Sequence, residues 1–161
     1  MIVIMGVSGC GKTTVGKLLS KKLGMAYFDA DDFHPQSNVD KMKNGTPLTD
    51  EDRLPWLVTL ANEIEKWEAK GGAILSCSAL KEKYRQVLAS KINTITWIYL
   101  SGSFDLIKSR LENRDEHYMK SHLLQSQFDA LEIPDYGLEI NITSTPQEIV
   151  NTIISKLNTN E

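Results

Sequence analysis

The sequence from Ile2 to Thr13 reads Ile-Val-Ile-Met-Gly-Val-Ser-Gly-Cys-Gly-Lys-Thr. It begins with a short apolar run that is typical of a buried strand. It continues as Gly-x4-Gly-Lys-Thr, the phosphate-binding P-loop pattern, which needs a strand before it and a helix after it. Residues 12–23 place apolar side chains on one face and end at Gly24, so they predict that helix. The stretch therefore predicts an α/β fold that begins with a cradle for the phosphates of a nucleoside triphosphate.

Short apolar runs alternate with amphipathic segments along the rest of the chain. We expect further strands at residues 25–28, 73–77, 94–100 and 138–142, and helices at about 37–43, 50–69, 80–89, 104–113, 123–131 and 146–157. This alternation is typical of a parallel sheet covered by helices on both faces. Because neither an internal repeat nor a linker is visible, we expect residues 1–161 to form a single domain.

Composition and charge exclude several classes of function. Of the 161 residues, 41% are hydrophobic and 24% are charged, which is ordinary for a globular protein. The formal net charge is −3 and no long basic run is present, so we expect no nucleic-acid partner.

The apolar start is too short for a signal peptide or a membrane span. The two cysteines, Cys10 and Cys77, are typical of free thiols in a reducing compartment. We therefore expect a cytoplasmic protein that does not bind membranes.

The P-loop assigns roles to its own residues. Its glycines let backbone N–H groups point at the phosphates, and the helix N-terminus adds a partial positive charge. Lys12 is expected to contact the β and γ phosphates, and the Thr13 hydroxyl is placed to bind Mg²⁺. Cys10 lies within the loop but has no chemical role that we can assign. The predicted nucleotide-binding set in the loop is Gly6, Ser8, Gly9, Cys10, Gly11, Lys12, Thr13 and Thr14.

Three carboxylates, Asp29, Asp31 and Asp32, follow the second predicted strand. In an open parallel sheet the ligand lies beyond the carboxyl ends of the strands, which places this acidic cluster opposite the γ-phosphate. Carboxylates there can hold the water shell of Mg²⁺ and accept a proton from an attacking hydroxyl. The alternative is a solvated turn that caps a helix. The strand-end position favours phosphoryl transfer to a hydroxyl group.

Cationic side chains suggest an anionic acceptor and a segment that closes over the nucleotide. Arg53, Lys81 and Arg85 follow the acidic segment or the third predicted strand. A second group lies at a helix end and in the polar stretch after it, where it can exclude water and bring a guanidinium to the transferring phosphoryl group. A charged helix face is the alternative interpretation of this second group, which consists of Arg110, Arg114, His117, Lys120 and His122.

Longer segments form a pattern that is more specific than the P-loop. They include Met5-Gly-Val-Ser-Gly-Cys-Gly-Lys-Thr-Thr14, Asp29-Ala-Asp-Asp-Phe-His-Pro35, Gly45-Thr-Pro-Leu-Thr-Asp-Glu-Asp-Arg-Leu-Pro-Trp-Leu57, Cys77-Ser-Ala-Leu-Lys81 and Leu123-Leu-Gln-Ser-Gln-Phe128. Together with Asn38, Tyr84-Arg85, Arg110 and Arg114, they follow in order across about residues 4 to 134. On these segments the chain resembles the gluconokinases, small kinases of the shikimate-kinase-like P-loop group.

The resemblance implies ATP-dependent phosphorylation of D-gluconate at its 6-hydroxyl. It also implies a five-stranded parallel sheet in the order 2-3-1-4-5, a lid at about residues 114–122, and a homodimer. By the same resemblance Asp29 supports Mg²⁺ through water, Arg114 stabilises the transferring phosphoryl group, and Arg110 lies against the nucleotide. Asp31 or Asp32 would accept the hydroxyl proton. The implied acceptor-binding set is Asp32, His34, Arg53, Lys81, Arg85 and Gln127.

The residues themselves leave two other functions open. One is a kinase of a different small anion, such as shikimate, adenylyl sulfate or a nucleoside monophosphate. The other is a regulatory module that binds a nucleotide and has no acceptor, which would leave the acidic segment unexplained.

Overall fold

The computed structural model describes residues 1–113 and 121–159, in which five strands form one sheet with the order β2-β3-β1-β4-β5. Every neighbouring pair is parallel. This order and pairing confirm the predicted fold class. The strands are β1 (Ile2–Met5), β2 (Ala26–Asp29), β3 (Ala73–Ser76), β4 (Thr96–Ser101) and β5 (Leu138–Asn141).

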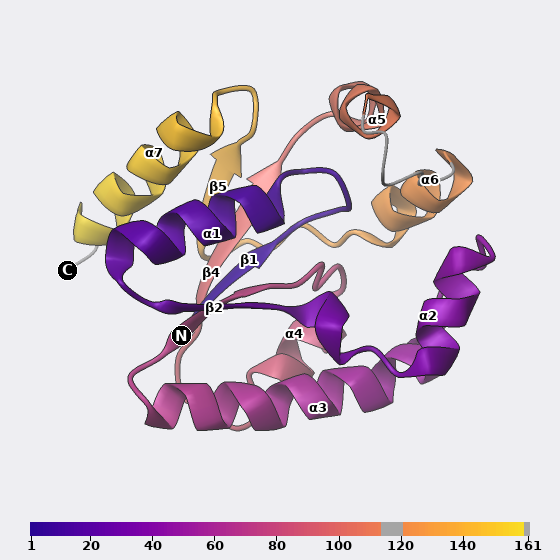
Figure 1. The fold of residues 1–161 in the computed structure, drawn as a ribbon, viewed down its shortest axis with the longest axis horizontal. Helices are drawn as coiled ribbons and strands as arrows, with labels where there is room; N and C mark the ends of the chain where they lie inside the picture. The colour runs from indigo at the N-terminus through magenta and orange to yellow at the C-terminus, as the bar shows by residue number, and fades with distance from the viewer. Residues whose placement is uncertain (114–120, 160–161) are drawn as a thin grey trace.

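Helices cover both faces of the sheet, with α1 and α7 on one face and α3 and α4 on the other (Figure 1). The remaining helices, α2, α5 and α6, stand toward the carboxyl ends of the strands (Figure 1). Among the described residues, no helix is both long and apolar enough to cross a membrane. The helices are α1 (Lys12–Leu23), the short 3₁₀ helix η1 (Ala30–Phe33), α2 (Gln36–Lys43), α3 (Asp50–Ala69), α4 (Glu82–Leu88), α5 (Phe104–Glu112), α6 (Ser121–Ala130) and α7 (Pro146–Thr159).

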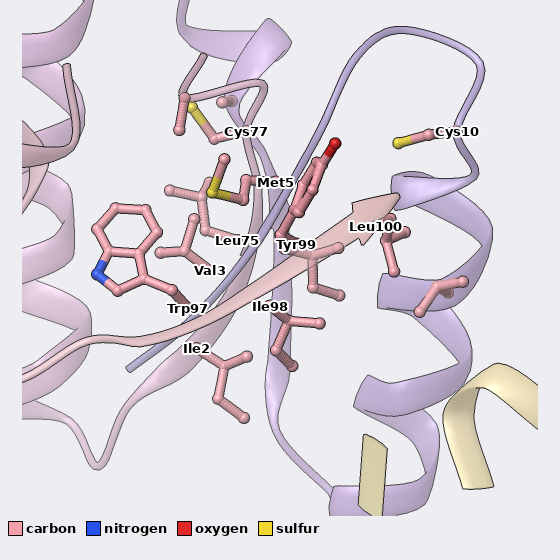
Figure 2. Packing of buried hydrophobic residues seen from close by; sticks show 14 of the residues in the cluster. Ile2, Val3, Met5, Cys10, Leu75, Cys77, Trp97, Ile98, Tyr99 and Leu100 are labelled. Carbon is pink, nitrogen blue, oxygen red and sulfur yellow. The ribbon is translucent and has the colours of Figure 1, made fainter. Parts of the chain in front are cut away.

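The core lies on both sides of the central strands. Every residue of β1 and β3 is buried, which explains why these strands are continuous apolar runs without alternation. Figure 2 shows their side chains packed with those of β4, including Val3, Leu75 and Ile98. Burial raises the pKa of the Cys77 thiol to about 12, so this cysteine is a neutral packing residue.

The register of the parallel strands aligns the segments that carry the site. Ser76 of β3 pairs with Ile4 of β1 on one side and with Asp29 of β2 on the other. The loop after β1 is also tied to the loop after β3, because the Gly6 N–H donates to the Ser78 carbonyl at 3.3 Å. The P-loop and the acidic segment therefore leave the sheet from the same edge.

Two differences from the predicted elements concern this edge. The 3₁₀ helix at Ala30–Phe33 was not predicted; its N-cap is Asp29, whose Oδ1 accepts from the Asp31 N–H at 3.0 Å. Helix α4 begins at Glu82, two residues later than expected, because Ala79 and Leu80 belong to a loop in which Ala79 has a φ of 44°. By contrast, α3 begins at Asp50 as predicted, with a capping box between Thr49 and Asp52.

We expect Gly16→Ala to destabilise the fold where α1 packs against β2 and β3. A Cβ at Gly16 would lie 2.5 Å from Tyr27 Cε2 and 3.0 Å from Ser76 Oγ, so α1 would have to move away from β2 and β3. Overpacking of this kind costs about 1–3 kcal/mol of unfolding free energy. Chemical denaturation measures it, with the exposed Lys17→Ala on the same helix as the matched control. Equal stability of the two variants would contradict the packing described here.

Candidate active site

The P-loop between β1 and α1 has a backbone that requires glycine. Gly9 has a φ of 81°, and a Cβ there would lie 2.7 Å from Leu111 Cγ. Gly6 has a φ of 141°, and a Cβ there would lie 2.9 Å from the Leu100 carbonyl oxygen. The predicted loop residues therefore form a tight turn packed on β4 and α5, which ends at Gly11, the N-cap of α1. Thr14 is exposed in the first turn of α1.

The Lys12 side chain folds back over this loop. Its ammonium group donates to the carbonyls of Gly6 at 2.9 Å and Val7 at 3.0 Å, and it lies 4.0 Å from the Sγ of Cys10. Cys10 itself is buried under the loop, so its side chain packs against the core and does not face a ligand. The full charge of Lys12 thus sits over the loop and next to the partial positive charge of the α1 N-terminus.

A hydrogen-bonded chain joins the P-loop to the acidic segment. The Thr13 hydroxyl donates to Asp29 Oδ2 at 3.2 Å. The Tyr27 hydroxyl donates to Ser76 Oγ at 3.0 Å, and Ser76 Oγ donates to the Lys12 carbonyl at 3.0 Å. Burial raises the pKa of Tyr27, so its hydroxyl stays protonated. Sequence reasoning gave Tyr27 and Ser76 no role, and only the paired ends of β2 and β3 could have indicated one.

The acidic segment presents two further carboxylates to solvent. Asp31 and Asp32 lie in η1 and are exposed, with 82% of the Asp31 side chain accessible. Asp31 Oδ1 lies 3.8 Å from the Nε2 of His34. Both interpretations of the acidic cluster thus have support, because Asp29 caps a short helix and also faces the P-loop through Thr13. An exposed carboxylate beside the phosphate cradle can accept a proton from a hydroxyl group.

The side chain of His34 is buried, although that of the nearby Asp31 is exposed. Its ring stacks on Trp56 with centroids 4.1 Å apart, and its side chain is 4% exposed. Burial, and then the positive charge of Arg53, lower the pKa of His34 to about 4. The imidazole is therefore neutral at physiological pH. Trp56 is held in turn by its indole N–H, which donates to the Ala30 carbonyl at 2.7 Å.

The predicted acceptor-binding cations Arg53 and Lys81 converge on one aromatic ring. The Arg53 guanidinium lies 5.4 Å and the Lys81 ammonium 5.8 Å from the centre of the Tyr84 ring. Asp50 accepts a hydrogen bond from the Tyr84 hydroxyl and pairs with Lys81 at 3.5 Å. Burial, and then the bond to Asp50, raise the pKa of Tyr84 to about 12. Tyr84 belongs to the sequence pattern given above but had no predicted role; its spacing of three residues from Lys81 at the start of α4 was the available signal.

Arg85 does not join this cationic group, and its predicted role as an acceptor-binding residue finds no support. Its side chain is 2% exposed, and each of its three nitrogens donates to a protein oxygen. The acceptors include the carbonyls of Ala79 at 2.8 Å and Glu132 at 2.9 Å. A side chain that is this buried, with each nitrogen bonded to the protein, is not presented to a ligand. Arg85 instead fixes the loop after β3, including the strained Ala79.

The C-terminal candidates contact three different segments of the chain. Gln127 of α6 accepts from the Ser8 N–H at 2.7 Å and donates to the Ser8 hydroxyl at 3.2 Å. Arg110 donates to the Ile142 carbonyl at 2.6 Å, which places it beside the turn after β5. His122 Nε2 lies 2.9 Å from the Gly45 carbonyl, so the start of α6 reaches the loop between α2 and α3. The other predicted residues of this group, Arg114, His117 and Lys120, lie outside the described residues.

Comparisons with known proteins agree with this geometry. A protein-family model described as an AAA domain matches residues 2–133. A gluconokinase of Arabidopsis thaliana is 41% identical over 170 residues, which cover 96% of this chain and 90% of that protein. The crystal structure of a gluconokinase from Sinorhizobium meliloti has a TM-score of 0.89 at 34% identity and covers 99% of this chain and 93% of that one. A shikimate kinase from Aquifex aeolicus has a TM-score of 0.69 at 17% identity, which shows a shared fold alone.

The lowered pKa of His34 predicts a pH-dependent stability. The unfolded imidazole binds a proton as the pH falls below 6.5, whereas the folded one resists protonation until about pH 4. Unfolding free energy should therefore fall between pH 6.5 and 4, by at most about 3 kcal/mol from this group. Denaturant titrations of the wild type and of His34→Gln across this range measure the effect. The variant should lose less stability than the wild type, and parallel curves would contradict the prediction.

The bonding of Arg85 predicts that Arg85→Lys is destabilising. Lysine cannot reproduce the guanidinium fork, so at least one buried carbonyl of Ala79 or Glu132 would lose its donor. We expect a loss of about 3 kcal/mol in unfolding free energy, measured by denaturation. The exposed Gln86→Ala on the same helix serves as the control. A fully stable Arg85→Lys protein with weakened acceptor binding would restore the role predicted from the sequence.

Proposed function

The chain belongs to the gluconokinase family, and from this we propose that it transfers the γ-phosphoryl group of ATP to the 6-hydroxyl of D-gluconate, giving 6-phospho-D-gluconate and ADP. The observation that carries the proposal is the Thr13–Asp29 hydrogen bond of 3.2 Å. It joins the phosphate cradle to the acidic segment, whose further exposed carboxylates Asp31 and Asp32 would have no use in a module that only binds a nucleotide. Catalysis of this reaction needs mainly positioning and charge stabilisation.

The residues divide into a donor side and an acceptor side. On the donor side, the P-loop N–H groups and Lys12 bind the phosphates and stabilise the charge that develops as the bond to the leaving oxygen breaks. On the acceptor side, Arg53 and Lys81 bind the gluconate carboxylate. Asp31 or Asp32 accepts the proton of the 6-hydroxyl as its oxygen bonds to phosphorus.

The oxygen ligands at the junction of the two sides fit Mg²⁺. The Thr13 hydroxyl and the Asp29 carboxylate are hard oxygen donors within hydrogen-bond reach of each other, and Mg²⁺ prefers such ligands and retains waters. Among the described residues, no cluster of three or more His, Cys, Asp or Glu side chains could hold a metal by protein ligands alone. When bound with the nucleotide, the ion would neutralise charge on the phosphates. Thr13 would hold it directly, and Asp29 would hold it through water.

Gln127 and Arg110 complete the proposed site. Gln127 bonds Ser8 in this structure, and we propose that its amide also reaches a hydroxyl of the acceptor. Arg110, which is bonded beside the turn after β5, would lie against the nucleotide. We also propose one kinase domain, a lid at about residues 114–122 that contributes Arg114, and a homodimer. A cytoplasmic location is proposed from the free thiols Cys10 and Cys77.

A coupled assay of ADP release tests the proposed acceptor. We expect turnover with D-gluconate and little with shikimate, adenylyl sulfate or nucleoside monophosphates. Lys12→Ala should lower kcat/KM by about 10²–10³-fold, because it removes charge from the transferring phosphoryl group. The exposed Lys17→Ala, five residues further along α1, is the matched control and should keep full activity. Strong turnover with shikimate alone, or an active Lys12→Ala protein, would overturn the assignment.

A further inference from the structure

Asn38 is a buried polar residue that the proposed mechanism does not use. It lies in α2, four residues after His34, and is 2% exposed. Its side-chain nitrogen donates to the Asp52 carbonyl at 2.9 Å and lies 3.2 Å from His34 Nδ1. A buried amide directed at an imidazole in a candidate site needs an explanation beyond packing.

The contacts of Asn38 determine where His34 carries its proton. The Asp52 carbonyl can only accept, so the Asn38 atom facing it must be the amide nitrogen. The second N–H of that nitrogen is then directed at His34 Nδ1, which must accept it. A neutral imidazole with an accepting Nδ1 carries its proton on Nε2. This Nε2–H lies on the edge of the ring that faces Asp31, with 3.8 Å between His34 Nε2 and Asp31 Oδ1.

The charged groups around His34 favour the neutral ring. Arg53 of α3 opposes protonation, and burial against Trp56 acts in the same direction. The negative charge of Asp52 of α3 is balanced by Lys41 of α2, whose ammonium lies 2.8 Å from the Asp52 carboxylate. Asp31 of η1 is the anion that faces the ring, and its side chain is largely exposed to water. These groups and the Asn38 amide together leave one form of the imidazole, which is neutral and protonated on Nε2.

We propose that Asn38 is a positioning residue that fixes His34 in this form, so that the Nε2–H of His34 orients the Asp31 carboxylate toward the acceptor hydroxyl. A movement of less than about 1 Å would turn the 3.8 Å separation into a hydrogen bond, and contacts in active sites commonly tighten in this way when substrate binds. The inference rests on the proposed function for its acceptor. It selects Asp31 over Asp32 as the group that accepts the proton, because in the part of the chain that the structure describes an imidazole faces Asp31 and none faces Asp32.

Nitrogen NMR of the imidazole rings tests the tautomer without any turnover. In the wild type we expect His34 to show an unprotonated Nδ1 and a protonated Nε2 throughout pH 5.5 to 8, with His34→Gln providing the assignment. In Asn38→Asp the new carboxylate can only accept, so Nδ1 must become protonated and the ring should be a cation near pH 6. A wild-type His34 that carries its proton on Nδ1, or that titrates near its ordinary pKa, would overturn the proposal.

A second variant covers the case in which Asn38→Asp does not fold. Asn38→Ser keeps one hydroxyl proton, which can serve either the Asp52 carbonyl or His34 Nδ1 but not both. We expect the His34 ring of this variant to populate both tautomers. A ring that stays fully in the Nε2-protonated form would show that Asn38 does not determine the tautomer, which would overturn its role.

Kinetics test whether the Nε2–H matters for the reaction. The amide of glutamine reaches about as far as Nε2 and that of asparagine about as far as Nδ1. Both variants should lose activity, and kcat of His34→Asn should be about 10- to 100-fold lower than that of His34→Gln, the value of one hydrogen bond to a charged group. KM for ATP should not change in either variant. Asp31→Asn should lower kcat more than Asp32→Asn. Equal losses in the two histidine variants, or a larger loss in Asp32→Asn, would count against the proposal.

The pH profile of Asn38→Asp separates positioning from a structural role. Its kcat should fall as the pH rises through the new ionisation of His34, because loss of the Nε2 proton leaves a lone pair facing Asp31. The double variant Asn38→Asp/His34→Gln should not show this fall of kcat with pH, since an amide does not titrate. A fall that persists in the double variant would overturn the proposal. If gluconate is not the acceptor, turnover is absent in all variants while the NMR result stands, so the two failures are distinguishable.

Discussion

Ile4, Ser76 and Asp29 lie side by side across three parallel strands, and the candidate site depends on this register. The row places the start of the P-loop, the hydroxyl that accepts from Tyr27, and the first carboxylate at one edge of the sheet. A slip by one residue would turn every side chain of a strand to the opposite face. Because β1 and β3 are apolar on both faces, side-chain polarity alone does not oppose such a slip. The ends of the two strands are tied instead by backbone hydrogen bonds, from the Cys77 N–H to the Ile4 carbonyl at 3.0 Å and from the Gly6 N–H to the Ser78 carbonyl at 3.3 Å, and these bonds help to fix the spacing of the polar groups.

Beyond this edge, aromatic rings hold the groups proposed to bind the acceptor. Trp56 supports His34 from one side, and the Tyr84 ring lies close to Arg53 and Lys81. Rings of this kind exclude water and leave the hydrogen-bonding edges of their neighbours available. The helices α3 and α4 that carry these rings pack on the face of the sheet opposite α1 (Figure 1). Donor and acceptor residues therefore come from helices on different faces and meet at the carboxyl ends of the strands.

Sequence patterns predicted the sheet and its main helices because those elements follow from apolar periodicity and from caps such as Gly24 at the end of α1. The P-loop and the acidic segment were also predictable, since strand-end position determines where they lie. The function of individual polar residues was less predictable. Arg85 has the residue type of a ligand-binding cation, but its three nitrogens bond the protein, and only the fold reveals those partners. The pairing of Asn38 with His34 depends likewise on the Asp52 carbonyl, which comes from another helix.

The folded-back Lys12 makes phosphate binding an exchange of partners. Its ammonium already donates hydrogen bonds to the carbonyls of Gly6 and Val7. The free energy that a ligand gains from Lys12 is therefore only the difference between its own hydrogen bonds to the ammonium and the two that it replaces. A polyphosphate with several negative charges replaces the two carbonyls with a net gain, because a charged acceptor forms a stronger hydrogen bond than a neutral carbonyl. A ligand with one charge or none gains little by displacing them. These two bonds of Lys12 thus favour polyphosphates over singly charged anions at the P-loop.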